Sequence, residues 1–447
     1  MKPYNYIKQI TIHILLGIVL FSFKPISTFF LLGIVAYFSY KIFTAKKNEQ
    51  SLQILIACSY IVGAEVLIRM TGGSLLYEAS KYLVIIFCLI GFFKTGLNLK
   101  SIPFILYFLL IIPGIFVAGF SVGENTELRK AIAFNLSGPV CLGIVAMFCY
   151  QLKIRYADIH KIFNAIALPL ISTTTYLFLY APSIKEIVTG TGSNFAASGG
   201  FGPNQVATVL GLGMFVLTVR FFMNSNSIFL KGVNLILLAL LSYRGIVTFS
   251  RGGIVAAVIM IVAFLFYYFN KSTYKNKTRI SQLLFVFISI GLFVWVFSSI
   301  QTSGFIDKRY ANQDGKGREK KDITTGRKQL VSFEFNTFFE NPILGVGVGK
   351  IKELRLEKEG VYAASHNELS RILAEHGLFG IFAFLILLIT PLVYRIKNKK
   401  NIFFYSFYFF WFLTINHSSM RIAAPAFIYG LCLLNIKYEP KRIKHKN

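Results

Sequence analysis

Two arginines lie where a polar segment meets an apolar one, in the stretch "TFSRGGIVAAVI". Arg251 falls between two strongly apolar runs, and Arg244 precedes it by seven residues, about two helical turns. A charge at the edge of a bilayer is costly and normally has a partner. Two guanidiniums facing one cavity would suit a pyrophosphate, because their planar forks pair with phosphate oxygens. The alternative is that both side chains only snorkel to lipid headgroups.

A histidine opens the stretch "SHNELSRILAEHGLFG". We expect a helix to begin here, with Ser365 or Asn367 as its N-cap. His366 would then lie at the mouth of an apolar span. Because imidazole titrates near neutral pH, His366 is a candidate base that takes a proton from an attacking hydroxyl. A solvated helix start is the commoner fate of a lone histidine.

Three further polar residues are candidate ligands for a substrate. Asn204 follows Pro203 in "GGFGPNQVATVLGLG", where a helix is expected to start, and its amide would bind sugar hydroxyls or phosphate unless it only caps the helix. Asn367 and Arg421 are the other two, Arg421 coming from the stretch "NHSSMRIAAP". Glu65 and Arg69 have the same four-residue spacing as His417 and Arg421, and we interpret them as a structural pair.

The elements that must position these residues are membrane helices. The chain has 447 residues, of which 55% are hydrophobic and only 15% charged, whereas soluble domains carry about 25% charged residues. This excludes soluble enzymes, disordered chains and disulfide-rich modules. The apolar runs are continuous, which argues against a β-barrel. We therefore expect an all-α, polytopic membrane protein with about 12–14 spans, forming a single membrane domain over residues 1–447.

Fourteen apolar runs supply these spans, and the last two are short enough to form a re-entrant pair. The runs are Ile10–Phe23, Ile26–Phe43, Leu52–Met70, Ala79–Phe93, Ile102–Phe120, Ala131–Tyr150, Ile162–Ala181, Val206–Phe222, Phe229–Phe249, Ile254–Phe269, Leu283–Ile300, Leu378–Tyr394, Ile402–Ile415 and Ile422–Ile436.

The charge of the chain follows the expected topology. Lysine and arginine number 47 against 19 acids, a formal charge of +28. Basic residues concentrate in alternate loops, which places the N-terminus and the tail in the cytoplasm, so we do not expect a nucleic acid partner. The candidate residues then lie on the outer face of the membrane. The five cysteines have no CxxC spacing and are expected to be lipid-facing or core residues.

One large outer loop, residues 301–370, precedes the last third of the spans. It begins with the charged stretch "DKRYANQDGKGREKKD", which has the composition of a solvated segment. The next stretch, "TTGRKQLVSFEFNTFFENP", has helical spacing of apolar residues and is expected to lie as an amphipathic helix on the outer leaflet. The chain has no P-loop, HExxH, GxSxG or dinucleotide motif, and no outer acidic cluster for Mg²⁺. We therefore expect no metal and no cofactor.

Four stretches, in this order, resemble the superfamily of O-antigen ligases and polymerases, bacterial enzymes that transfer envelope glycans. They are "FGPNQVATVLGLG", "FSRGGIVAAVI", "TGRKQLVSFEFNTFFENPILGVGVG" and "HNELSRILAEHGLFG", all within residues 200–380. The last is the most specific, with His366, ten intervening residues and Gly377. A dozen or more spans with one dominant outer loop also fit this superfamily.

The resemblance implies a reaction and roles for these residues. Such enzymes transfer a glycan from undecaprenyl pyrophosphate to a sugar hydroxyl at the outer face of the bacterial inner membrane, by a metal-independent, inverting reaction. The acceptor is lipid A core for a ligase and another lipid-linked repeat for a polymerase. By resemblance, Arg251 and Arg244 would hold the leaving pyrophosphate and His366 would activate the acceptor. Arg327 and Asn204 match positions that line the cavity.

Two alternatives to a ligase-like enzyme stay open. A polymerase for O-antigen, capsule or exopolysaccharide repeats would use the same residues, because loops without a portable code select the acceptor. A polysaccharide transporter or flippase would instead have inverted repeats and polar groups in the middle of the membrane. The polar candidates of this chain gather at the outer ends of spans, which favours a transferase.

Overall fold

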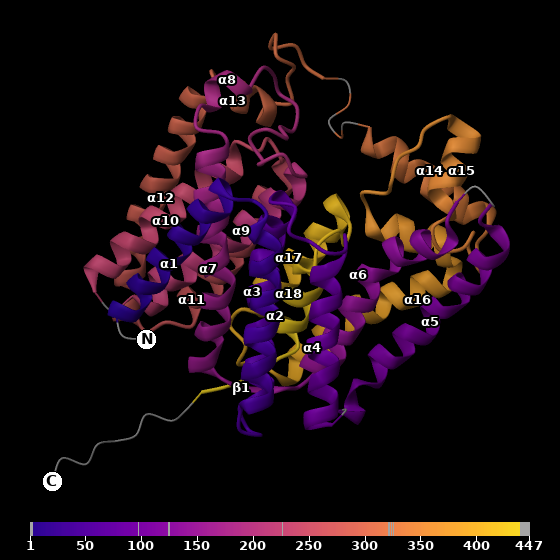
Figure 1. The fold of residues 1–447 in the computed structure, drawn as a ribbon, viewed down its shortest axis with the longest axis horizontal. Coiled ribbons are helices and arrows are strands. Elements are labelled where there is room, and N and C mark those ends of the chain that lie inside the picture. Colours follow the sequence, from indigo (N-terminus) through magenta and orange to yellow (C-terminus); the bar gives the residue numbers. More distant parts are fainter. Residues whose placement is uncertain are drawn as a thin grey trace.

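The computed structural model describes residues 3–96, 98–123, 126–225, 227–320, 322, 324 and 326–438, and it is mostly helical (Figure 1). Continuous apolar runs form helices because each helix satisfies its own backbone hydrogen bonds where water is absent. The first half contains α1 (Pro3–Ser22), α2 (Ile26–Thr44), α3 (Gln50–Met70), α4 (Ala79–Thr95), η1 (Leu99–Ser101), α5 (Ile102–Ser121), α6 (Leu128–Cys149), β1 (Lys153–Arg155), α7 (Tyr156–Tyr180), α8 (Ile184–Ile187), α9 (Pro203–Val219) and the π-helix η2 (Arg220–Asn224).

The second half carries most of the candidate residues. Its elements are α10 (Ile228–Ile246), α11 (Arg251–Asn270), α12 (Tyr274–Gln301), α13 (Phe305–Tyr310), α14 (Arg327–Glu340), α15 (Lys350–Glu359), α16 (Glu368–Lys397), α17 (Phe404–Ser418), α18 (Ala424–Cys432) and β2 (Asn435–Lys437). Each of the fourteen expected apolar runs lies largely within one of these helices.

Eleven helices of the described residues are long and apolar enough to cross a membrane, so the chain is a polytopic membrane protein. Eleven is fewer than the 12–14 spans expected. The difference comes from α4, α17 and α18, which have 17, 15 and 9 residues and fall short of about 20 residues per span. Most residues of α17 and all residues of α18 are buried inside the bundle.

The bundle has two ends, which we call the loop face and the tail face. The loop face comprises the connections 181–202, 247–250, 302–367 and 419–423, which hydrogen-bond to one another at several points. The tail face carries the parallel pair β1–β2, which joins the start of α7 to the end of the described chain. Figure 1 shows α13, α14 and α15 at the loop face and β1 at the opposite end.

The short pair α17–α18 crosses the whole bundle. Before α17, the side chain of Asn401 donates to the carbonyl of Leu431 near the tail face, and after α17 that of Ser419 donates to the carbonyl of Ser365 at the loop face. The pair therefore reaches both faces, and the re-entrant alternative is wrong. α17 packs against α11, and α18 packs against α6.

Helices α9 and α11 approach each other very closely through small residues. A β-carbon on Gly253 would lie 2.7 Å from the backbone of Ala207 and Thr208, and one on Gly211 would lie 2.9 Å from the carbonyl of Gly253. Small residues let membrane helices pack backbone to backbone. This contact brings the first residues of α9 and α11 together at the loop face.

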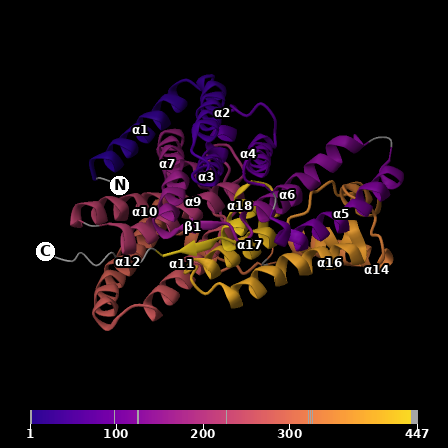
Figure 2. The same ribbon diagram turned by 90° about the horizontal axis from the view of Figure 1, so that it is seen from below.

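Gly377 interrupts α16, and the second half of the large loop packs against the helix at this point. Gly377 has φ 58°, outside the helical region, and the amide of Leu378 donates to the carbonyl of Pro342. Gly345, Gly347 and Gly349 all have positive φ and pack against α16, α5 and α6 respectively. In Figure 2, α14 lies beside α16 and α5 at one end of the bundle.

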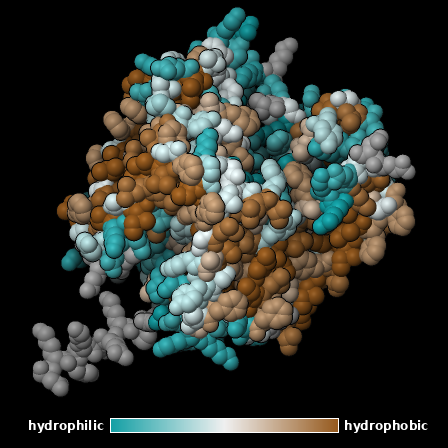
Figure 3. All heavy atoms as spheres, in the orientation of Figure 1, coloured by the Kyte–Doolittle hydropathy of each residue, from teal (hydrophilic) through white to brown (hydrophobic). Residues whose placement is uncertain are grey.

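The surface agrees with a membrane location. Figure 3 shows broad hydrophobic areas over the flanks of the bundle, with hydrophilic residues concentrated above and below them. Many of the large exposed apolar side chains lie on α5, α11 and α12. The five cysteines are all free and buried, as expected for core residues.

Candidate functional site

A cavity of about 370 Å³ lies at the loop face, where α9, α11 and α14 begin. Three of the residues expected to bind substrate line it, and its other described lining residues include two further cations and no carboxylate. The lining comprises Asn204, Ser250, Arg251, Gly252, Arg309, Thr324, Arg327, Lys328, Val331 and Asn416. A polar cavity with this composition favours an anion.

Three arginines from three elements meet at this cavity. Arg251 begins α11 and donates to the carbonyl of Arg309 at 3.3 Å, and Arg309 donates through Nε to the carbonyl of Phe249 at 3.2 Å. Arg327 begins α14. Burial, then Arg251 and Arg327, lowers the pKa of Arg309, and burial, then Arg251, lowers that of Arg327. Like charges held this close are stabilised when an anion binds between them.

The backbone adds to this positive field. The N-caps of α9 and α11, Gly202 and Ser250, make no side-chain cap hydrogen bond, so first-turn amides stay available. The Ser250 hydroxyl instead donates to Oδ1 of Asn204 at 2.7 Å. With its oxygen engaged, Asn204 keeps its amide hydrogens as donors at the cavity. Asn204 is therefore not the cap of α9, and two helix N-termini point their partial positive charge at the same space.

His366 lies in the link before α16; it does not line the cavity, but it interacts electrostatically with the lining residue Arg327. Its side chain is partly buried, and its ring makes no hydrogen bond with the residues that the structure describes. Burial first, then the charges of Arg327 and Arg421, lowers the pKa of His366 to about 4. The imidazole is therefore neutral at pH 7, with a lone pair able to accept a proton.

Asn367 and Arg421 hold the His366 segment from both sides. Asn367, rather than Ser365, is the N-cap of α16, because its side chain accepts from the amide of Ser370 at 3.1 Å. The same side chain donates to the carbonyl of Asn416 at 3.4 Å. Arg421 donates to the carbonyl of Ser365 at 2.6 Å. Neither lines the cavity among the described residues, so the geometry gives both a positioning task.

A buried charge network lies beneath the same segment. Glu334 on α14 pairs with Arg355 on α15 at 2.8 Å, and both side chains are fully buried. The same carboxylate accepts from the hydroxyls of Ser365 and Ser370. The network therefore joins α14, α15 and α16. The amphipathic helix expected over this stretch is α14, but its buried side faces α16 rather than a leaflet.

Arg244 lies apart from the cavity. Its side chain is fully buried and donates to the carbonyls of Ala181 and Ala197, each at 3.2 Å, with the guanidinium over the ring of Phe178. Arg244 therefore neither snorkels to headgroups nor joins Arg251. It fixes the glycine-rich connection 181–202 to α10. The expected pair Glu65–Arg69 is confirmed at 2.8 Å.

Reasoning from the sequence missed several lining residues, among them Arg309, Lys328 and Asn416. Arg309 stood in a stretch whose alternating charges are typical of a solvated segment, yet it is buried in α13. Lys328 follows Arg327 directly, and that repeated charge was an available signal. Asn416 enters from α17, and no local pattern marked it. The described residues hold no group of three or more His, Cys, Asp or Glu that could bind a metal ion.

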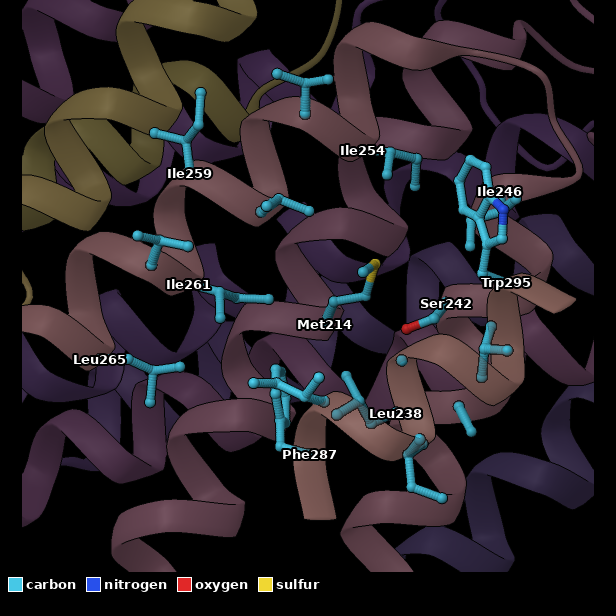
Figure 4. Close-up of a pocket in the computed structure, with 18 of the residues that line it drawn as sticks. Met214, Leu238, Ser242, Ile246, Ile254, Ile259, Ile261, Leu265, Phe287 and Trp295 are labelled. Atoms are coloured by element: carbon cyan, nitrogen blue, oxygen red, sulfur yellow. The ribbon is translucent and has the colours of Figure 1, made fainter. Parts of the chain in front are cut away.

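An apolar groove of about 500 Å³ lies between α10, α11 and α12 (Figure 4), and Tyr310, which lines it, directly follows the cavity residue Arg309 in the chain. Its upper end is formed by Ile254, one turn below Arg251, and by Trp295 and Tyr310, whose rings lie 4.9 Å apart. Val255, Val258 and Val262 on its wall are 44–58% exposed, which opens the groove to the lipid side. A cavity lined by cations therefore lies near a groove whose apolar lining would fit an alkyl chain.

Comparison with known proteins identifies the second half of this arrangement. Residues 235–385, about a third of the chain, match the model of the O-antigen ligase family, so the chain carries a domain of that family. The match includes Arg244, Arg251, Arg309, Arg327 and His366, whereas Asn204 and Arg421 lie outside it. No curated protein matches the chain. The family covers ligases and polymerases, which indicates a glycan-transferring enzyme.

Proposed function

We propose that this chain, with its O-antigen ligase family domain at residues 235–385, transfers a glycan from undecaprenyl pyrophosphate to a sugar hydroxyl at the outer face of the bacterial inner membrane. The observation that carries the proposal is the convergence of Arg251, Arg309 and Arg327 on one cavity that adjoins an apolar groove. The acceptor is lipid A core in a ligase-like reaction, our leading assignment, and a second lipid-linked repeat in a polymerase.

The donor fits the two spaces in one orientation. The pyrophosphate occupies the arginine cavity, where guanidiniums and helix N-termini meet its charge. The polyprenyl chain leaves along the groove between α10, α11 and α12, whose exposed valines let it remain in the membrane. The first sugar then lies at the mouth of the cavity, next to His366.

The reaction needs one base and a set of fixed cations. The acceptor oxygen forms a bond to the anomeric carbon while the bond from that carbon to the pyrophosphate oxygen breaks. The hydroxyl proton passes to His366, and the electron pair of the broken bond stays on the pyrophosphate. Charge develops on that leaving group, and pre-placed arginines stabilise it without reorganisation. A base within reach of the weakly nucleophilic hydroxyl contributes about 10²- to 10⁴-fold.

Donor binding also prepares the base. Burial first, and then the field of Arg327 and Arg421, lowers the pKa of His366 and keeps it neutral in the empty site. When the pyrophosphate neutralises part of that field, the imidazole becomes a stronger base. His366 is thereby activated when a donor is present, which limits transfer to the loaded enzyme.

The first test is the surface glycan of a deletion strain. We expect wild type to restore it and His366→Ala and Arg309→Gln to fail, although both variants accumulate in the membrane. Arg318→Gln is the matched control, because Arg318 lies in the same loop, exposed and paired with Asp314, and should restore the glycan. Normal glycan with His366→Ala and Arg309→Gln would refute the proposal. Bare core in the deletion strain identifies a ligase, and single repeats identify a polymerase.

A further inference from the structure

A row of aromatic rings and guanidiniums lies on the loop face beside His366. The side chain of Arg69 lies between the rings of Tyr77 and Phe201, 4.7 and 5.8 Å from their centroids. Tyr77 contacts Phe134 at 6.4 Å between ring centroids, and Arg421 lies 4.7 Å above Phe134. Tyr77 is 58% exposed, so its ring is accessible to a ligand.

The row and the arginine cavity both contact the His366 segment. Ser365 contacts the row, since Arg421 donates to its carbonyl, and together with Phe134 and Asn135 it borders a crevice of about 10 Å³. Asn367 donates to the carbonyl of Asn416, a residue that lines the arginine cavity. The segment 365–367 therefore links the two spaces, with His366 between the two contacts.

The stereochemistry of displacement requires two such spaces. In an inverting transfer the nucleophile attacks the anomeric carbon from the side opposite the leaving group. If the leaving pyrophosphate occupies the arginine cavity, the acceptor hydroxyl lies across the anomeric carbon from that cavity, where His366 can take its proton. The row contacts the His366 segment without lining the cavity, and so provides a surface for the acceptor. Aromatic faces suit the apolar C–H face of a pyranose, and Arg421 and Asn135 can donate to its hydroxyls.

We propose that this row is the acceptor subsite, in which Tyr77 and Phe134 stack against a pyranose ring of the acceptor glycan and present its hydroxyl to His366. The inference rests on the proposed function, because the acceptor side is defined by the place of the leaving group. The crevice is too small for a sugar ring, so the sugar ring lies above it, against the exposed Tyr77 and the partly buried Phe134.

Buried ions hold the row rigid. Glu65, paired with Arg69, accepts from the amide of Ala423 at 2.8 Å, and Lys81, paired with Glu78, donates to the carbonyl of Met420 at 3.1 Å. Both contacts fix the link that carries Arg421. A preformed surface loses little freedom when a ligand binds, which suits a weakly bound sugar.

The test uses the purified full chain in detergent with methyl β-glucoside, methyl β-galactoside and methyl N-acetyl-β-glucosaminide, observed by saturation-transfer NMR. We expect at least one to receive saturation at its ring protons from wild type and from Tyr77→Phe. Tyr77→Ala and Phe134→Ala should weaken that binding about fivefold, the order of one lost stacked ring. Tyr362→Ala removes another exposed tyrosine, stacked against Lys352, and should bind as wild type does.

Two outcomes would overturn the subsite: no saturation of any of the three pyranosides by wild type, or equal binding by Tyr77→Ala and Tyr77→Phe. A parallel measurement of farnesyl pyrophosphate binding separates this failure from that of the proposed function. Wild type should bind it, and Arg309→Gln should bind it more weakly. If binding of farnesyl pyrophosphate does not depend on Arg309, the donor site is wrong, whereas intact donor binding with unaltered pyranoside binding in Tyr77→Ala refutes only the subsite.

Discussion

Individual residues at this site act through the electric field that they share. Arg251, Arg309 and Arg327 surround one cavity, and Arg327 and Arg421 also reach His366. A cluster of cations is unfavourable by itself and becomes favourable around an anion. Under the proposed function this field binds the donor, and it also adds to the effect of burial in lowering the pKa of His366.

The field makes the pH profile of transfer predictable. The pKa of His366 is lowered to about 4, so kcat/KM should be flat near neutrality and fall only as the pH approaches that value. Arg327→Gln removes a positive charge that disfavours the imidazolium. The pKa of His366 should then rise, and the acid limb of kcat/KM should move to higher pH, whatever the loss in rate. Measuring kcat/KM from pH 4 to 8 for both proteins checks this, and a limb that stays in place contradicts the role of His366.

A buried ion pair and its hydrogen bonds join the elements around the site. Glu334 connects α14 to Arg355 of α15 and to Ser365 and Ser370 at the start of α16. Removing one partner of a buried pair leaves the other charge without compensation, which costs far more than losing an exposed pair. The network therefore determines where His366 lies, although Glu334 does not line the cavity.

Glu334→Gln should destabilise the packing of α14 and α15 on α16. The change keeps the shape of the side chain but leaves Arg355 without its counter-charge, at a cost of about 3 kcal/mol. Thermal unfolding in detergent should shift to lower temperature, and the loop should become more sensitive to protease. Glu340→Gln on the same helix removes an exposed pair with Lys358 and should change stability by less than about 0.5 kcal/mol. Equal stability of the two variants would contradict this account.

The described residues form fourteen apolar helices between the two faces, and eleven of these are long and apolar enough to span a membrane. The even number places the start of α1 and the strand β2 at the same end of the bundle. From the positive charges of alternate loops we propose that this end is cytoplasmic. Under that proposal the loop face, with the cavity and His366, lies outside.

Labelling of single cysteines tests this orientation. Lys316 on the loop face and Lys400 on the tail face are both exposed, while the five native cysteines are buried. A membrane-impermeant maleimide should label Lys316→Cys in cells whose inner membrane is intact. Lys400→Cys should react only after that membrane is opened, and wild type should stay unlabelled in both states. The reverse pattern would place the cavity in the cytoplasm.

Local features were readable in the sequence because they depend on neighbours along the chain. The fourteen apolar runs become helices since a segment without water must satisfy its own hydrogen bonds. Asn367 as a cap, Pro203 at the first turn of α9 and the pair Glu65–Arg69 are also contacts within four residues. The resemblance to the O-antigen ligase family rests on such local stretches too.

Only the tertiary structure decided which of these residues meet. Arg251 and Arg309 are 58 residues apart in the chain, and Arg421 and Ser365 are 56 apart, so helix packing alone brings them into contact. Arg244 precedes Arg251 by two helical turns in the sequence, but its side chain donates to carbonyls of the connection 181–202. Spacing along one segment determines the side of a helix on which a residue lies. The residues that it meets on that side belong to other segments, and the positions of those segments depend on how the whole bundle packs.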